Sequence, residues 1–61
     1  MKTLKSLSNY ELGEYLCLLY RMEVEINKFN HLEDTDAYQK LKLKTSESIL
    51  SAEQEQIKRE E

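Results

Sequence analysis

Apolar residues recur at spacings of three and four through the first half of the chain. The positions that follow this spacing are Leu12, Tyr15, Leu19, Met22, Ile26 and Phe29. Alternating steps of three and four place side chains on one face of an α-helix. The pattern therefore predicts a helix from about residue 8 to residue 29, with this stripe packed against a second helix.

The predicted helix has a recognisable start. Ser8-Asn9-Tyr10-Glu11 is typical of a capping box, in which Ser8 and Glu11 bond each other's backbone N–H groups. Leu7 and Leu12 occupy the two positions of a hydrophobic staple around this cap. We expect residues 1–7 to form a mobile lead. At the other end, we expect Asn30 to close the helix in a left-handed conformation.

The segment 30–35 interrupts the pattern. If the stripe continued, it would bury Glu33, Asp36 and Lys40. Thr35 and Asp36 instead suit a new helix start. We predict a second helix from about residue 35 to residue 58, with a core stripe of Tyr38, Leu41, Thr45, Ile49 and Ala52. A short connection favours antiparallel packing, so residues 1–61 are predicted to form one all-α domain, a two-helix antiparallel hairpin.

The first predicted helix carries more apolar residues than one core stripe needs. Gly13, Cys17, Tyr20 and Val24 follow spacings of four, three and four on the opposite side, with Leu16 at the edge. Leu43, Leu50 and Ile57 form a further stripe on the second helix, spaced by seven. A two-helix hairpin covers one side of each helix only. We therefore predict a protein interface made of Gly13, Leu16, Cys17, Tyr20 and Val24; the alternative is that these residues border one wide core.

The short chain also favours association. With 61 residues and one Cys, it has no internal disulfide, and a core of this size rarely supplies more than about 3–5 kcal/mol. We expect a homodimer that forms a four-helix bundle; a hairpin that meets a foreign partner and a higher oligomer are the alternatives. In length and pattern the chain resembles the Rop-type helical hairpin, which dimerises into such a bundle. That resemblance does not extend to motifs.

Candidate chemistry is sparse. We interpret Cys17 as a buried structural thiol, because no cation or helix N-terminus stands near it in sequence to activate it. His31 lies beside Glu33, Asp34 and Asp36, but the spacing lacks the features of a calcium loop, so a solvated acidic loop is the preferred interpretation. No nucleophile–base pair or phosphate loop is recognisable. We therefore expect no enzyme activity, no metal and no cofactor.

Charge and hydropathy further limit the classes of function that the chain can have. The net charge is −3, and Lys40 and Lys44 share a face as the main basic patch. No apolar run has the length of a membrane span, so we expect a cytoplasmic protein without membrane contact. We predict a non-catalytic protein that binds and modulates a larger protein as an inhibitor or adaptor, a kind frequent in phages and other mobile elements. The alternative is a dimeric, Rop-like RNA- or DNA-binding modulator that uses Lys40 and Lys44.

Overall fold

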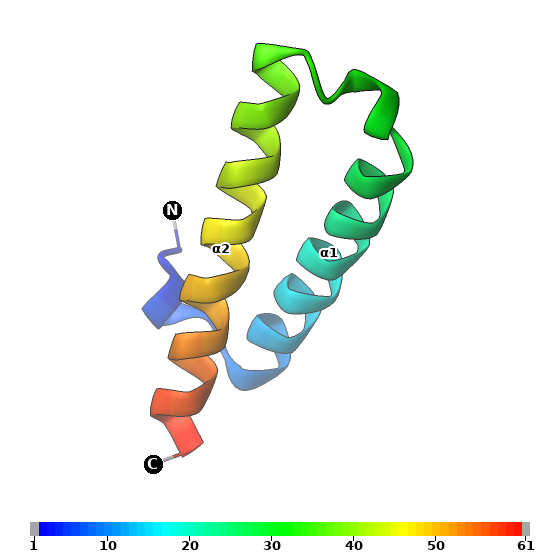
Figure 1. Cartoon of the computed structure of the whole chain (residues 1–61). Helices are drawn as coiled ribbons and strands as arrows, with labels where there is room; N and C mark the ends of the chain where they lie inside the picture. Colours follow the sequence, from blue (N-terminus) through cyan, green and yellow to red (C-terminus); the bar gives the residue numbers. More distant parts are fainter. Residues whose placement is uncertain (1, 61) are drawn as a thin grey trace.

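Two long helices packed side by side make up most of the molecule. The computed structural model describes residues 2–60, in the order η1 (Leu4–Ser6), α1 (Asn9–Lys28), η2 (Asn30–Leu32) and α2 (Asp36–Glu60). Figure 1 shows α1 and α2 as a hairpin, with η1 folded back beside the last turns of α2. The prediction of an all-helical hairpin is confirmed, and residues 2–60 contain no strand.

The predicted capping box sets the start of α1. The backbone N–H of Glu11 donates to the Ser8 hydroxyl at 3.1 Å, and the Ser8 N–H donates to the Glu11 carboxylate at 2.9 Å. These two bonds satisfy donors that have no partner within the helix. The sequence thus specified the entry into α1 through local hydrogen bonds alone.

The end of α1 differs from the expectation. Phe29, at φ −101° and ψ 39°, closes the helix, and no residue among 2–60 has a positive φ. The prediction that Asn30 adopts a left-handed conformation was therefore wrong. Instead, tight turns follow one another: the Leu32 N–H donates to Phe29 at 2.9 Å and the Thr35 N–H to Leu32 at 2.8 Å. Such short 3₁₀ turns use the exposed carbonyls without a left-handed residue.

The core lies at the end of the hairpin where the helices are closest (Figure 1). Its buried cluster consists of Leu12, Leu16, Leu19, Ile49 and Ala52, of which Ala52 is fully buried. Tyr15 and Met22 border this cluster, and Phe29 and Leu41, predicted to be core, are each 48 % exposed. The small Ala52 side chain lets the helices approach closely there. Toward the connection the helices separate (Figure 1), so Phe29 and Leu41 stay in solvent, although Ile26 and Tyr38 are still buried there.

Two buried polar groups lie between the core cluster and the connection. The Tyr38 hydroxyl donates to the backbone carbonyl of Ile26, which joins α2 to α1, and the Thr45 hydroxyl donates to the Leu41 carbonyl at 2.9 Å. Among residues 2–60, every buried side-chain nitrogen and oxygen has a hydrogen-bond partner. Burial of these groups is therefore compatible with stable packing.

The segment before α1 folds back onto the hairpin, where we predicted a mobile lead; Met1 lies outside the described residues. Leu4 and Leu7 pack against the core cluster. Arg59, near the end of α2, donates to the Asn9 side chain at 3.0 Å and to the Leu4 and Lys5 carbonyls at 3.3 Å. The sequence pattern did not reveal these contacts because they join residues fifty or more positions apart.

Candidate protein-binding surfaces

The outer face of α1, defined as Gly13, Cys17, Tyr20 and Val24, is open to solvent. Val24 is 54 % exposed, Tyr20 is 42 % exposed and Cys17 is also exposed. A Cβ atom placed on Gly13 would have no neighbour within 4 Å, so the space above this glycine is free. Tyr10, with 76 % of its surface exposed, extends the face by one turn. The structure therefore brings these four predicted interface residues together.

Two predictions about this region need correction. Leu16, which we expected at the edge of the interface, is 4 % exposed and belongs to the core cluster. Leu12, Leu16 and Leu19 follow the 3.6-residue period of a straight α-helix, so they share one face of α1. That face packs against α2 where the two helices are closest. Cys17 is an exposed thiol and not a buried structural residue, because the single hairpin does not cover this side of α1.

A shallow groove runs along the outer face of α1. It is lined by Asn9, Tyr10, Gly13, Glu14, Cys17, Leu18 and Arg21. Glu14 and Arg21 both line this groove, seven positions apart in sequence. Within residues 2–60, neither of them takes part in an ion pair, whereas five other acid–base pairs do form. The groove thus combines small and apolar residues with one acid and one base whose charges are not paired within the chain.

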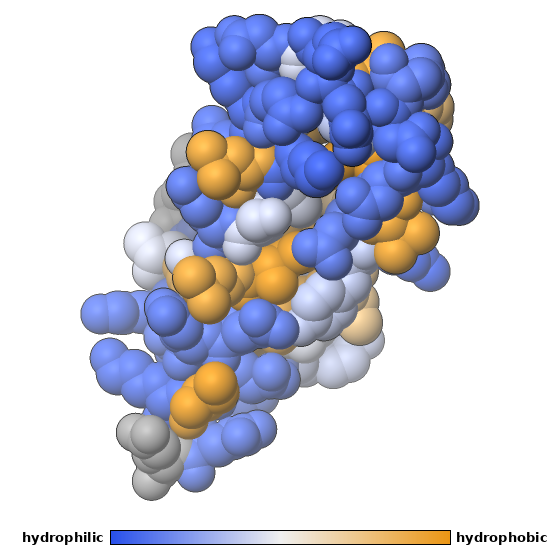
Figure 2. All heavy atoms as spheres, viewed as in Figure 1, coloured by the Kyte–Doolittle hydropathy of each residue, from blue (hydrophilic) through white to orange (hydrophobic). Residues whose placement is uncertain are grey.

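The outer face of α2 carries the second exposed stripe, Leu43, Leu50 and Ile57. These side chains are 62 %, 57 % and 59 % exposed. Figure 2 shows separate hydrophobic groups along α2, while the end that holds the connection is mostly hydrophilic. The predicted interface does not include this stripe, although its seven-residue period is visible in the sequence. Within residues 2–60, nothing covers it.

Polar residues separate the two exposed stripes on the side where Tyr20 lies. The Tyr20 hydroxyl donates to the Glu53 carboxylate of α2 at 2.7 Å. This hydrogen bond to an anion raises the pKa of Tyr20. Lys42, Ser46 and Glu53 share a face of α2 by spacings of four and seven. If two hairpins formed a square four-helix bundle through this side, Lys42 and Glu53 would point toward the centre of the bundle.

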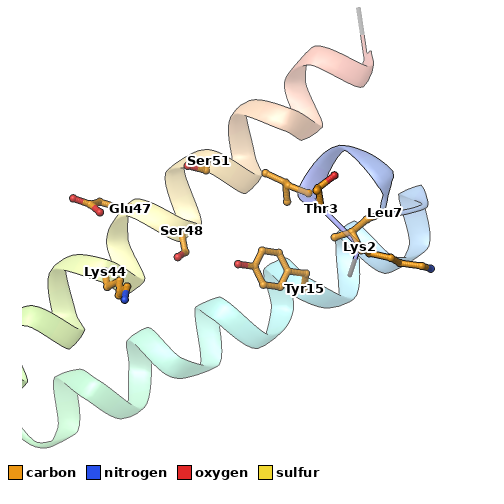
Figure 3. A pocket seen from close by; sticks show the side chains of 9 residues that line it. Lys2, Thr3, Leu7, Tyr15, Lys44, Glu47, Ser48 and Ser51 are labelled. Carbon is orange, nitrogen blue, oxygen red and sulfur yellow. The ribbon is translucent and has the colours of Figure 1, made fainter.

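The two lysines of the predicted nucleic-acid surface have different surroundings. Lys40 lies 3.3 Å from Asp36, in an exposed ion pair within the first turn of α2. Lys44 lines a second groove, between α1, α2 and the N-terminal segment, together with Tyr15 and Glu47. Figure 3 shows Tyr15 and Ser48 pointing into this groove from opposite helices. Acids therefore accompany both lysines, which lowers the positive potential of the patch.

The remaining candidate chemistry gave no site. His31 lies in η2 beside Phe29, with ring centroids 6.0 Å apart. Across the part of the chain that the structure describes, no three His, Cys, Asp or Glu side chains gather around a common point that could hold a metal ion. In the same part of the chain, neither helix has the length and apolarity needed to cross a lipid bilayer.

Comparisons with family models, with curated proteins and with solved structures found no match to this chain.

Proposed function

We propose that this protein is a non-catalytic binding protein, which pairs with a second copy through α1 and modulates a larger protein through α2. The observation that supports this proposal is the presence of two separate apolar stripes on one small, highly charged hairpin. Large apolar side chains that are aligned on an exposed helix face are typical of an interface. Two stripes on different helices provide one surface for each partner.

The chemistry of each face suggests which partner it takes. The outer face of α1 includes Gly13 and Cys17, whose small side chains let another helix approach closely. The α2 stripe offers one leucine or isoleucine every seven residues, with Ser46–Glu47 and Glu53–Gln54 between them. A second copy of α2 would bring the same acidic side chains to the same interface. A larger protein with its own cationic or amide groups at those positions fits the α2 stripe better.

A paired capture experiment tests this assignment. The tagged protein and its Leu50→Glu and Gln56→Glu variants are incubated with lysate of the source cells, and bound proteins are identified by mass spectrometry. Both substitutions are at exposed residues of α2 and add the same charge, but Gln56 lies outside the α2 stripe. We expect a larger protein that is captured by the parent chain and by Gln56→Glu but not by Leu50→Glu. Equal capture by both variants, or no enriched protein at all, would contradict the proposal.

Nucleic-acid binding through Lys40 and Lys44 is the alternative function. It predicts an affinity for RNA or DNA that falls steeply as the salt concentration rises. Fluorescence anisotropy with labelled RNA and DNA at low salt measures this affinity directly. Binding that Lys44→Gln abolishes would favour the alternative over a protein target.

A further inference from the structure

We infer that the second copy binds the outer face of α1 in one antiparallel register, with Cys17 on the two-fold axis. This inference rests on the dimer part of the proposed function and specifies its geometry. A two-fold interface requires the same surface on both chains to be complementary to itself. The outer face of α1 meets this requirement because its residues are placed almost symmetrically about Cys17.

The apolar contacts match around this axis. Tyr10 and Val24 are each seven positions from Cys17, on opposite sides, so each lies opposite the other in the second copy. Gly13 is four positions before Cys17 and Tyr20 is three after it, so each tyrosine ring meets the free space above a glycine. Large side chains opposite small ones are the arrangement that packed helices favour. Tyr10, Tyr20 and Val24 would thereby lose most of their solvent exposure.

The charges match in the same register. Glu14 is three positions before Cys17 and Arg21 is four after it, so each acid lies beside the arginine of the second copy. The pairing forms twice, once on each side of the axis. A parallel arrangement would instead place Glu14 beside Glu14 and Arg21 beside Arg21. Both side chains line the α1 groove, and neither is ion-paired within residues 2–60, so both are available.

The Tyr20–Glu53 hydrogen bond prepares this surface for association. It holds the Tyr20 side chain on the α2 side of the α1 outer face, at the border of the proposed interface. A side chain that is already restrained loses less conformational entropy when it is buried. The central Cys17 is exposed. Helices that approach to about 8 Å can bring facing Cα atoms within disulfide range.

Cysteine cross-linking tests the register. The parent protein is treated with the thiol oxidant diamide, and disulfide-linked dimers are measured on non-reducing gels. In a Cys17→Ser background, Tyr10→Cys and Val24→Cys chains are oxidised separately and as a mixture. We expect Cys17 to link to itself and the mixture to give a linked dimer of one chain of each kind. Each single variant, oxidised alone, should give at least tenfold less.

A chain that carries both Tyr10→Cys and Val24→Cys in the Cys17→Ser background adds an internal check. The two positions are fourteen residues apart, or about 21 Å along one helix, so they cannot form a disulfide within one chain, and we expect a linked dimer. Leu50→Cys in the same background is the control for pairing through α2. Strong linking of Val24→Cys to itself would show a parallel arrangement and overturn the register. Strong linking of Leu50→Cys to itself would move the interface to α2.

Charge reversal provides a second, non-covalent test. We expect Arg21→Glu to weaken the dimer about tenfold and Glu14→Arg with Arg21→Glu to restore it, because the second change re-forms both pairs. Lys58→Glu, an exposed change of the same sign on α2, should leave the dimer unaltered. Dimer dissociation is measured by analytical ultracentrifugation, with circular dichroism to establish folding.

Light scattering separates failure of the register from failure of the dimer. If the protein is a dimer but the double reversal does not restore its affinity, or the mixed cross-link does not form, the register is overturned. Self-association then still holds. A folded monomer at every concentration overturns both this inference and the dimer part of the proposed function. In that case the capture experiment on α2 still tests the larger-protein part independently.

Discussion

The Tyr20 hydroxyl and the Glu53 carboxylate form a 2.7 Å hydrogen bond that joins α1 to α2 across 33 positions of the chain. Among the side-chain hydrogen bonds between α1 and α2, this bond lies nearest to the outer face of α1. The bond therefore connects the packing of the hairpin to the position of an interface residue. Because the bond raises the pKa of Tyr20, a titration of this tyrosine can detect it.

Glu53→Gln should lower the pKa of Tyr20 back toward its ordinary value of 10.0, because the amide accepts a hydrogen bond without a negative charge. Ultraviolet absorbance of tyrosinate as a function of pH measures this pKa, and Tyr20→Phe identifies the transition. Since the folded state raises this pKa, the contribution to stability is present below the ordinary value and is lost as the pH rises through the raised one. An unchanged titration would show that the bond does not form in solution.

Leu19→Asp should abolish folding at ordinary concentrations. Leu19 is 4 % exposed in the core cluster, and burial of a carboxylate there costs several kcal/mol, about as much as the whole stability of so small a core. Leu18→Asp is the matched control, because Leu18 is the adjacent residue and is 54 % exposed. Circular dichroism should show lost helicity for the first variant only. Retained helicity in Leu19→Asp would contradict the core assignment.

Ser8→Ala should destabilise the hairpin by about 1 kcal/mol, since it removes the acceptor of the Glu11 N–H bond. Ser8→Asp retains an acceptor at this position and should remain close to the parent protein. Thermal and urea unfolding measure the difference. Ser46→Ala, at an exposed serine of α2, controls for the loss of a hydroxyl. Equal stability of all four proteins would mean that the cap contributes nothing.

The protein should lose stability in acid partly through Glu11. The hydrogen bond from Lys2, with a further bond from the Ser8 N–H, lowers the pKa of Glu11 from 4.5 to about 2. Because the folded state lowers this pKa, the contribution is present above 4.5 and is lost as the pH falls toward 2. Urea unfolding at several pH values should therefore show a shallower loss for Glu11→Gln. Glu23→Gln, at an exposed residue outside the proposed interface, changes the net charge equally and should keep the steeper loss.

Local features of the fold were predictable from sequence, and the contacts between distant segments were not. The Ser8–Glu11 cap and the break after α1 depend on neighbouring residues, so their signals are complete in a short window. The burial of Leu16 depends on how closely Ala52 lets the helices approach. The position of Leu4 depends on its hydrogen bond with Arg59 at the far end of α2. No periodicity within one helix contains that information.

The candidate surfaces show the same division. Spacing alone was enough to group Gly13, Cys17, Tyr20 and Val24 on one side of α1, because helical geometry fixes which residues share a face. Whether such a face is covered depends on the other helix and on the N-terminal segment. That segment closes over the Tyr15 side of the hairpin and leaves the outer face of α1 open. Sequence pattern therefore defined the candidate face, and packing decided its exposure.

The contact of Arg59 with Leu4 and Lys5 brings the beginning and the end of the described chain to the same end of the molecule. The hairpin is therefore nearly a closed ring of backbone, open only between η1 and the last turn of α2. A short linker across that opening would allow new ends to be made in the exposed connection around Asp34. In such a circularly permuted protein α2 would precede α1, and both outer faces would keep their residues and their separation.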